Sequence, residues 1–559
     1  MHIKALSKQI SVSDQITIED LAEIAALDVE ILVCNRPDGE AEQQENFSCL
    51  EEAAKGYGID MIHIPFRNGE MSPEHNSHFI ELIHTGKNIH VYCRTGNRST
   101  MLWASCSKQL GIAIEEILAA TTQAGFDASD CLGVDTTKAV PLSDPLKRNY
   151  YEVAIIGAGS GGIAVAASLL KRKPDLRIAI IDPAQYHFYQ PGWTMVGGGV
   201  FGPESTRRAT SSLVPRGVSW IQQSVIQFSP DDQMVNLADG SEVRYGQLIV
   251  SAGLKLDWSA IEGLEDSLGR NGVTSNYRYD LAPYTWQLVQ GLENGKAVFT
   301  QPPMPIKCAG APQKALYLSA DHWFRQKRLK NISIDFYNAG GVLFGVETYV
   351  PALMKYIDKY GVKLNFNHSL VKVDGDRQRA WFAHSDEAGI AHTSETEFDM
   401  LHVCPPQIAP DFIRNCVLAD EMGWLDVDPQ TLRHKTFGNI WGLGDVTNTP
   451  NAKTMAAARK QAPVVAENVC QAINGMEPVV GYDGYGSCPL TVERGKIVLA
   501  EFGYGGKLLP SFPSWVNPGN QATKRAWFLK THLLPSIYWH GMLKGREWLV
   551  APEQLSHLD

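Results

Sequence analysis

The sequence predicts an α/β protein with parallel sheets, assembled from three or four structural units. Short apolar runs suited to buried strands alternate with helix-like stretches, which is the pattern of a parallel sheet covered by helices. A glycine-rich turn at 157–162 directly follows one of these runs, as in a dinucleotide-binding fold. At 559 residues the chain also exceeds what one ordinary core can organise.

Composition narrows the class of protein. A hydrophobic content of 44% and a charged content of 20% are typical of a soluble globular protein. The net charge of −11 argues against a general nucleic-acid binder. No apolar run reaches the roughly 18 residues of a membrane-spanning helix, and the first residues lack the apolar stretch of a secretory signal. We therefore expect reduced thiols among the ten cysteines, and no bound metal.

Five segments follow from the pattern of strands, helices and linkers. They are a small α/β unit at 1–137, a polar proline-containing linker at 138–149, a dinucleotide-binding unit at 150–290 and 398–483, a second Rossmann-like unit at 291–397, and a C-terminal segment at 484–559. The last segment is rich in Trp, Tyr, Leu, Pro and basic residues, and we see no internal repeat.

The first dinucleotide signal is Gly157, Gly159 and Gly162 in G-x-G-x-x-G after an apolar strand. Glycine allows the tight turn and lets a pyrophosphate approach the backbone, and the following helix N-terminus favours its negative charge. Asp182 lies about 20 residues further on, at the end of the next strand, where an acid binds the adenine ribose. The alternative is a chance glycine turn, which the strand, the spacing and the acid together disfavour.

Further elements favour FAD over NAD. TFGNIWGLGD, ending in Gly444 and Asp445, resembles the second FAD motif of flavoproteins with two dinucleotide folds, and LIVSAG, ending at Gly253, resembles their intermediate strand. An ordinary strand-to-turn junction is the alternative for GLGD. After AVFT, where members that use NADH carry another glycine motif, this chain has QPPMPIKCAGAP, so a nicotinamide has no obvious site.

Cys308 and Cys488 lie in proline-containing segments, PIKCAGAP and GSCPL, far apart in the sequence. Cys308 follows Lys307 and precedes a helix predicted to begin near Ala311, and both a neighbouring ammonium and a helix N-terminus favour a thiolate. Cys488 is expected in a turn that presents its sulfur to a cavity. The alternative for any single cysteine is a buried, unreactive thiol.

From about residue 150 to 550 the chain resembles the sulfide:quinone oxidoreductases, particularly their mitochondrial-type branch. The resemblance is carried by GAGSGG, HFYQPGWTMVGGG, PIKCAGAPQK, FYNAGGVLFGV, MLHVCPP, GLGDVTN, DGYGSCPL and LLPSIYWHGMLKGREW. It implies Cys308 and Cys488 as a redox pair. It also implies FAD contacts at Ser160, Gly161, Asp182, Gln190, Val225, Asp445 and Lys453.

The reaction that the resemblance implies is a series of thiol exchanges. Hydrosulfide attacks the oxidised Cys308–Cys488 bridge, leaving a persulfide on Cys488 and a thiolate on Cys308. Electrons pass through FAD to a ubiquinone-type quinone. A small thiol such as glutathione or coenzyme A, or sulfite, removes the sulfane sulfur.

The segment from Lys524 to Val550 mixes aromatic, apolar and basic residues, with Lys530 among the basic ones, and Pro535 is expected to divide it into two short helices. Such a segment suits the headgroup region of a membrane, where a quinone is collected. The alternative is a helical pair packed on the protein's own core. We expect a peripheral membrane protein that faces the cytoplasm, on a bacterial inner membrane; a homo-oligomer is left open.

A third cysteine, Cys93 in VYCRTGNRS, lies at a strand end before a loop, Arg98 and a helix predicted from about Ser99. Loop amides and the helix N-terminus can stabilise a thiolate, and Arg98 can bind a sulfonate in bidentate fashion. Residues 1–137 resemble the phosphatase-like domain of β-lactamase-hydrolase-like proteins, whereas CRTGNRS itself resembles a rhodanese loop. Four residues separate Cys93 from Arg98, one fewer than a cysteine phosphatase needs, so we favour a sulfurtransferase over a phosphatase or an inert thiol.

Two other functions remain open at this point. An NADH:quinone oxidoreductase with an N-terminal phosphatase is disfavoured by the absence of a second nucleotide motif. A non-enzymatic flavin-bearing membrane adaptor or redox sensor would be favoured by loss of the FAD motifs or cysteines, and neither is lost.

Overall fold

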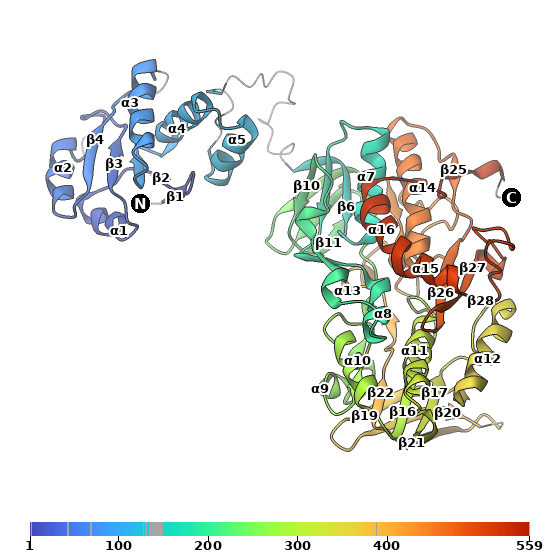
Figure 1. Ribbon diagram of the computed structural model, residues 1–559. Coiled ribbons are helices and arrows are strands. Elements are labelled where there is room, and N and C mark those ends of the chain that lie inside the picture. The colour runs from blue at the N-terminus through green and yellow to red at the C-terminus, as the bar shows by residue number, and fades with distance from the viewer. Residues whose placement is uncertain are drawn as a thin grey trace. The chain divides into compact units, whose positions relative to one another are not determined.

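A computed structural model describes residues 1, 3–41, 44–67, 70–126, 128, 131–132, 149–386 and 388–557. The chain forms two compact units, Met1–Arg148 and Asn149–Asp559, coloured from blue to red in Figure 1. Apart from Asn149, the linker expected at 138–149 lies outside the described residues.

The first unit is a five-stranded sheet of order β1-β2-β5-β3-β4. Its strands are β1 (Lys4–Ala5), β2 (Ile10–Ser13), β3 (Ile31–Cys34), β4 (Asp60–His63) and β5 (Ile89–Tyr92), all parallel except β1. The helices are α1 (Leu21–Ala25), α2 (Phe47–Lys55), α3 (Pro73–His84), α4 (Asn97–Gln109) and α5 (Ile114–Gln123). Buried strands alternate with helices, as the apolar runs predict.

The second unit begins with a seven-stranded sheet of order β10-β7-β6-β13-β12-β11, with β24 also paired to β13. Its strands are β6 (Tyr150–Ile156), β7 (Ile178–Ile181), β10 (Val218–Ile221), β11 (Val225–Ser229), β12 (Met234–Leu237), β13 (Glu242–Val250) and β24 (Ile440–Gly442). Helices α7 (Ser160–Arg172) and α14 (Met455–Ile473) pack side by side against it (Figure 1). Their apolar faces form the largest core with β6 and β7.

A second parallel sheet has the order β15-β22-β16-β17-β18. Its strands are β15 (Val273–Thr274), β16 (Gly295–Gln301), β17 (Ile332–Asn338), β18 (Lys363–Phe366) and β22 (Met400–His402). β15 and β22 therefore pair outside the range 291–397 expected for this unit, because the chain crosses between the two sheets at both ends. Helices α11 (Ala311–Arg325) and α12 (Val350–Tyr360) cover one face, and β19 (Ser369–Asp374), β20 (Arg379–Ser385) and β21 (Ala391–Glu397) form a separate antiparallel sheet.

The C-terminal part starts with the antiparallel strands β26 (Gly486–Glu493), β27 (Lys496–Phe502) and β28 (Ala522–Thr523). One helical path then runs through α15 (Lys524–Phe528), a π turn (Leu529–Leu533), α16 (Leu534–Ser536), a second π turn (Ile537–Gly541) and a final turn (Met542–Lys544). The expectation that Pro535 divides this segment is wrong. Wider turns on both sides of Pro535 keep the backbone helical despite its missing N–H.

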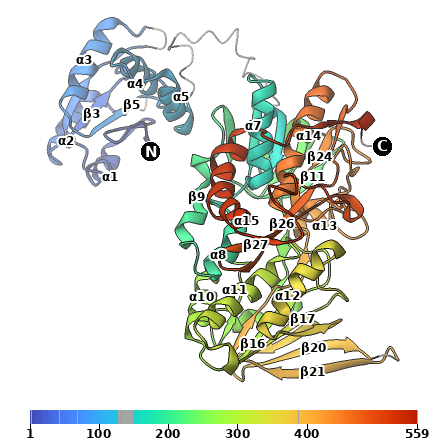
Figure 2. The same cartoon turned by 45° about the vertical axis from the view of Figure 1, so that its right-hand side comes forward.

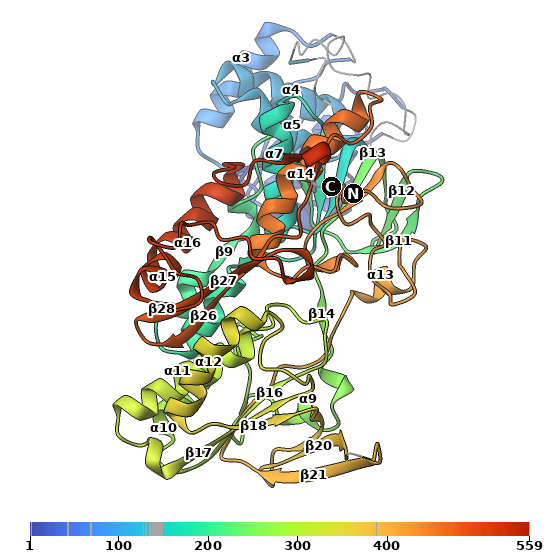
Figure 3. The same ribbon diagram turned by 90° about the vertical axis from the view of Figure 1, so that its right-hand side faces the viewer.

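Figures 2 and 3 show this helical path beginning beside β27 and ending beside α7. No helix within the described part of the chain has both the length and the apolar character needed to cross a bilayer.

The α/β fold class predicted from the sequence is confirmed.

Candidate functional site

The glycine-rich turn has the geometry of a dinucleotide cradle. A Cβ on Gly157 would lie 2.5 Å from the carbonyl oxygen of Ser251, and one on Gly162 would lie 1.8 Å from that of Gly157. Gly157 also has a φ of +101°. A Cβ on Gly159 would meet nothing within 4 Å, so its backbone is open to a ligand at the N-terminus of α7.

Asp182 and Asp445 lie at the ends of two parallel strands. The Asp182 carboxylate accepts hydrogen bonds from the backbone N–H of Ala158 at 2.6 Å and of Ala184 at 2.7 Å, which fixes it beside the glycine turn. Asp445 follows β24 in a turn that opens with Gly444 at φ +78°. Burial raises the pKa of the Asp445 carboxyl.

Both dinucleotide elements and one cysteine line a single cavity of about 1030 Å³. Among its lining residues are Gly157, Gly159, Ser160, Gly161, Asp182, Gln190, Gly253, Gly444, Asp445 and Cys308. A space of this size, with an open glycine turn at one end and carboxylates beside it, fits a dinucleotide cofactor. The residues present therefore suit the flavin that the sequence motifs predict.

Three expected cofactor contacts lie behind the cavity wall. Gly162 packs α7 against the turn, and Val225 is buried on β11 opposite Leu237. Lys453 is 7% exposed, and its Nζ donates to the carbonyl oxygens of Asp445 at 2.9 Å and Thr447 at 2.6 Å. Its own carbonyl accepts the backbone N–H of Cys308 at 2.8 Å, so Lys453 connects the turn of Asp445 to that of Cys308.

Folding brings the two cysteines together. The Sγ atoms of Cys308 and Cys488 are 3.4 Å apart, although 180 positions separate them in the chain. Cys308 precedes α11, whose predicted start at Ala311 is confirmed. A hydrogen bond from Cys488 and the charge of Lys314 outweigh burial and hold the pKa of Cys308 well below its usual value, whereas the same pairing and burial raise that of Cys488. Cys308 is thus the thiolate of the pair.

The ammonium beside Cys308 belongs to Lys314, not to Lys307 as the sequence suggested. Lys314 Nζ lies 3.0 Å from Cys308 Sγ. Lys307 Nζ instead donates to Oε1 of Gln190. Cys308 has a φ of +52°, and this left-handed turn sends the two neighbouring side chains in different directions.

Cys488 lies on a strand, which corrects the expectation of a turn. It is 2% exposed on β26, opposite Ala500 of β27. The following Pro489 is tolerated because β26 is an edge strand of its sheet. A Cβ on Gly310 would lie 2.6 Å from Cys488 Sγ, so glycine at this position lets the strand reach the Cys308 turn.

The C-terminal helical path supplies part of the cavity wall. Lys530, on the first π turn, is 2% exposed and donates from Nζ to the carbonyl oxygen of Pro191 at 2.9 Å. Burial and the charge of Lys314 lower the pKa of Lys530 to about 7. Its position corrects the expectation that Lys530 faces lipid headgroups, because the π turn directs the side chain inward. The Tyr538 hydroxyl lies 2.7 Å from Ser160 Oγ in the glycine turn.

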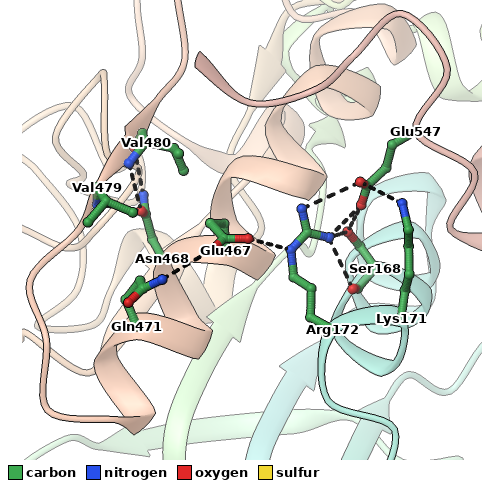
Figure 4. Close-up of polar contacts among 9 residues, drawn as sticks. All are labelled: Ser168, Lys171, Arg172, Glu467, Asn468, Gln471, Val479, Val480 and Glu547. Atoms are coloured by element: carbon green, nitrogen blue, oxygen red, sulfur yellow. Dashed lines mark hydrogen bonds and ion pairs between the residues drawn. The ribbon is translucent and has the colours of Figure 1, made fainter. Parts of the chain in front are cut away.

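An ion-pair cluster fixes the far end of this path to the cofactor-binding helices (Figure 4). Arg172 of α7 binds Glu467 of α14 through Nε at 2.8 Å and Glu547 through Nη1 at 2.5 Å. Lys171 adds a third contact to Glu547 at 3.0 Å. The end of the segment is therefore held by charges from two helices.

The segment is neither wholly buried nor wholly exposed. Tyr538, Trp539 and Leu543 belong to the main core, as the core-packing alternative supposed. Four other apolar side chains face solvent: Phe528 at 54%, Leu533 at 44%, Trp548 at 55% and Leu549 at 84% exposed. We call these four residues the apolar rim.

In the first unit, Cys93 follows β5 and is buried, and Arg98 lies in the first turn of α4, which begins two residues before the predicted Ser99. Arg98 donates from Nη1 to Glu40 Oε1 at 2.8 Å and from Nη2 to Glu40 Oε2 at 2.8 Å. Arg36 Nε lies 3.1 Å from Glu40 Oε2. The guanidinium that the sequence assigned to a sulfonate is thus paired with an internal carboxylate.

Sequence reasoning missed Lys314, Lys530 and Glu40. Lys314 is the fourth residue of α11 and lies six positions after Cys308, so its place in the first turn of the helix could have been inferred from the predicted helix start. Nothing local to Lys530 or Glu40 indicates a site, since only the tertiary fold places Lys530 in the cavity wall and Glu40 against Arg98.

Comparison with known proteins decides the family. Residues 2–110 match the family described as beta-lactamase hydrolase-like protein, phosphatase-like domain, and residues 151–285 match pyridine nucleotide-disulphide oxidoreductase. The chain is 38% identical over 400 residues to the mitochondrial sulfide:quinone oxidoreductase of Mus musculus, covering 71% of this chain and 87% of that protein. It is 39% identical over 404 residues to that of Dictyostelium discoideum, covering 71% and 87%.

The chain belongs to the sulfide:quinone oxidoreductase family. The sulfide:quinone oxidoreductase structure of Aquifex aeolicus has the same fold, with a TM-score of 0.59 and 19% identity over 72% of this chain and 93% of that one. The family membership and the N-terminal phosphatase-like domain that the sequence motifs indicated are confirmed, and both relatives and the oxidoreductase match support a flavin cofactor.

Proposed function

We propose that the second unit is an FAD-dependent sulfide:quinone oxidoreductase. The observation that carries this is the 3.4 Å approach of Cys308 and Cys488, with Cys308 on the wall of the cavity that suits the flavin. The names of the curated relatives support the same donor and acceptor.

In this proposal, hydrosulfide attacks the oxidised pair at Cys488. One S–S bond breaks and one forms, which leaves a persulfide on Cys488 and a thiolate on Cys308. Lys314 stabilises that thiolate as the leaving group. A thiol or sulfite then takes the sulfane sulfur from Cys488, and the two thiolates close again with loss of two electrons.

Gly159 and Asp445 would hold FAD, which would supply a two-electron acceptor for the cysteine pair and pass the electrons to a quinone. We assign Ser160, Gly161, Asp182 and Gln190 to holding the cofactor. Val225 and Lys453 act from behind the wall: Lys453 positions the turns of Asp445 and Cys308.

We further propose peripheral association with a quinone-containing membrane through the apolar rim, flanked by the exposed Lys524, Arg525, Lys544 and Arg546. The compartment named for the curated relatives is mitochondrial, so they lend no support to the bacterial inner membrane. Placement on the cytoplasmic side remains part of the proposal.

For the first unit we propose sulfane-sulfur transfer through Cys93, from thiosulfate or a persulfide to a small thiol such as glutathione or coenzyme A. Two observations support this over a phosphatase: the four-residue loop between Cys93 and Arg98, and the presence in the same chain of a unit for which we propose sulfide oxidation.

One experiment tests both units. Sulfide and decylubiquinone are added to the purified full chain with sulfite, glutathione or coenzyme A in turn, and quinone reduction and the sulfur product are followed. Turnover with sulfide and at least one acceptor is expected; no sulfide-dependent reduction with any acceptor would reject the oxidoreductase. Cys93→Ser should abolish cyanide-acceptor sulfurtransferase activity and leave quinone reduction intact.

A further inference from the structure

The Cys93 site contains its own anion. Both terminal nitrogens of Arg98 bind the two oxygens of Glu40, and Nη1 also donates to the carbonyl oxygen of Phe66 at 2.8 Å. Arg36, which is 4% exposed, binds the same carboxylate. Hydrogen bonds from Arg98 hold the pKa of Glu40 below its usual value, so the carboxylate is ionised at neutral pH.

Arg98 also contacts the cysteine. Burial lowers the pKa of the Arg98 guanidinium, but hydrogen bonds to Glu40 and to Cys93 outweigh burial and leave that pKa raised. The Arg98 guanidinium is therefore engaged by the Glu40 carboxylate through both terminal nitrogens. The fork that could bind a sulfonate is occupied.

Charge then distinguishes the possible sulfur donors. Arg36 and Arg98 both bind the ionised Glu40 carboxylate, so a donor that arrives at Cys93 finds both guanidinium groups already paired. A protonated persulfide adds no charge: Cys93–S⁻ and R–S–SH give Cys93–S–SH and R–S⁻. Thiosulfate gives Cys93–S–S⁻ and sulfite, and it brings two negative charges to a site where Glu40 already occupies Arg36 and Arg98.

We propose that Glu40 selects the donor at Cys93, admitting organic persulfides R–S–SH and disfavouring thiosulfate and other sulfur oxyanions. This rests on the proposed sulfurtransferase function and narrows its substrate class. It also places the first unit after a reaction that yields a persulfide, which is the chemical class that the Cys308–Cys488 unit releases to a thiol acceptor.

The test uses the full chain and cyanide as acceptor, with thiocyanate as the product. The donors are glutathione persulfide and thiosulfate, and the rate of the Cys93→Ser protein is subtracted from each. Wild type should use the persulfide with a kcat/KM about a hundredfold higher. Glu40→Gln should raise kcat/KM for thiosulfate at least about tenfold and change that for the persulfide less than about threefold.

Glu52→Gln makes the same charge change at an exposed position on α2 and should alter neither donor. Because the expected effect is a gain, loss of folding cannot mimic it. An unchanged donor ratio in Glu40→Gln would overturn the proposal. So would loss of both activities in Glu40→Gln with wild-type behaviour in Glu40→Asp, since the carboxylate would then be structural. Absence of Cys93-dependent transfer from either donor would instead reject the sulfurtransferase itself.

Discussion

The Lys314 ammonium lies 3.0 Å from the sulfur of Cys308, where its charge adds to the hydrogen bond from Cys488 in lowering the pKa of Cys308. Lys314 is 3% exposed, so its charge acts on Cys308 with little screening by water. The neighbour in sequence, Lys307, is engaged with Gln190 instead. Lys314, and not Lys307, is therefore the cation that contacts Cys308.

Replacing Lys314 by Met should slow the modification of Cys308. The pKa of Cys308 lies well below its usual value, so the reduced wild-type protein should react with iodoacetamide at pH 6 faster than an ordinary cysteine does. In Lys314→Met the pKa of Cys308 should rise, and alkylation at pH 6, followed by mass spectrometry of the Cys308 peptide, should fall about tenfold. Lys330→Met, at an exposed position, is the matched control. Equal alkylation rates at pH 6 in Lys314→Met and wild type would contradict this assignment.

Lys530 should make stability depend on pH. Its pKa is about 7 in the folded protein and near the ordinary lysine value of about 10.4 when unfolded, so the unfolded state binds more protons between these limits. The free energy of unfolding of the wild type should therefore increase as pH rises from about 7 toward 10. Below pH 7 the buried Lys530 is charged, and its full destabilising effect is present. Lys530→Met should raise Tm by about 2–4 °C at pH 6 and by less at pH 9. A Tm difference that is the same at both pH values would show that Lys530 is not the titrating group.

Cys308→Ser and Cys488→Ser should each retain flavin and lose sulfide-dependent quinone reduction by at least about a thousandfold. Neither serine can close the sulfur bridge, whereas the glycine turn and Asp182 are untouched. The visible spectrum measures flavin content, and decylubiquinone absorbance measures turnover. Cys416→Ser, at a half-buried cysteine outside the cavity lining, should behave as wild type. Substantial turnover in either site variant would remove the disulfide mechanism.

Membrane binding should depend on the apolar rim and not on the whole segment. Removing residues 524–559 would also remove Tyr538 and Leu543 from the core, so deletion confounds binding with folding. The combined change Phe528→Ser and Leu533→Ser, at the two rim positions outside the cavity lining, should reduce co-sedimentation with anionic vesicles about tenfold or more at unchanged flavin content. Val417→Ser with Met422→Ser, at exposed apolar positions elsewhere, is the control. Equal sedimentation of the two variants would favour the core-packing role alone.

The sequence was sufficient for the fold class and for the features that are local. The glycine turn, Asp182 and the start of α11 follow from spacing and helix-start signals within one strand–turn–helix segment. Features that depend on packing between distant segments could not be predicted from the sequence. The strand conformation of Cys488 depends on pairing with β27, and the inward direction of Lys530 depends on a π turn that no propensity predicts. The position of Glu40 at the Cys93 site also depends on long-range packing, because the loop after β3 that carries Glu40 contacts Arg98 of α4 only in the folded protein.

The central claim is that electrons enter at the cysteine pair from sulfide. The most direct measurement is anaerobic mixing of the oxidised protein with one equivalent of sulfide, or of NADH, while the flavin absorbance near 450 nm is recorded by stopped flow. Sulfide should bleach the flavin within the time of one turnover, the bleaching should disappear in Cys308→Ser and Cys488→Ser, and NADH should leave the absorbance unchanged. Rapid bleaching by NADH, with no response to sulfide, would contradict the account and favour an NADH:quinone oxidoreductase.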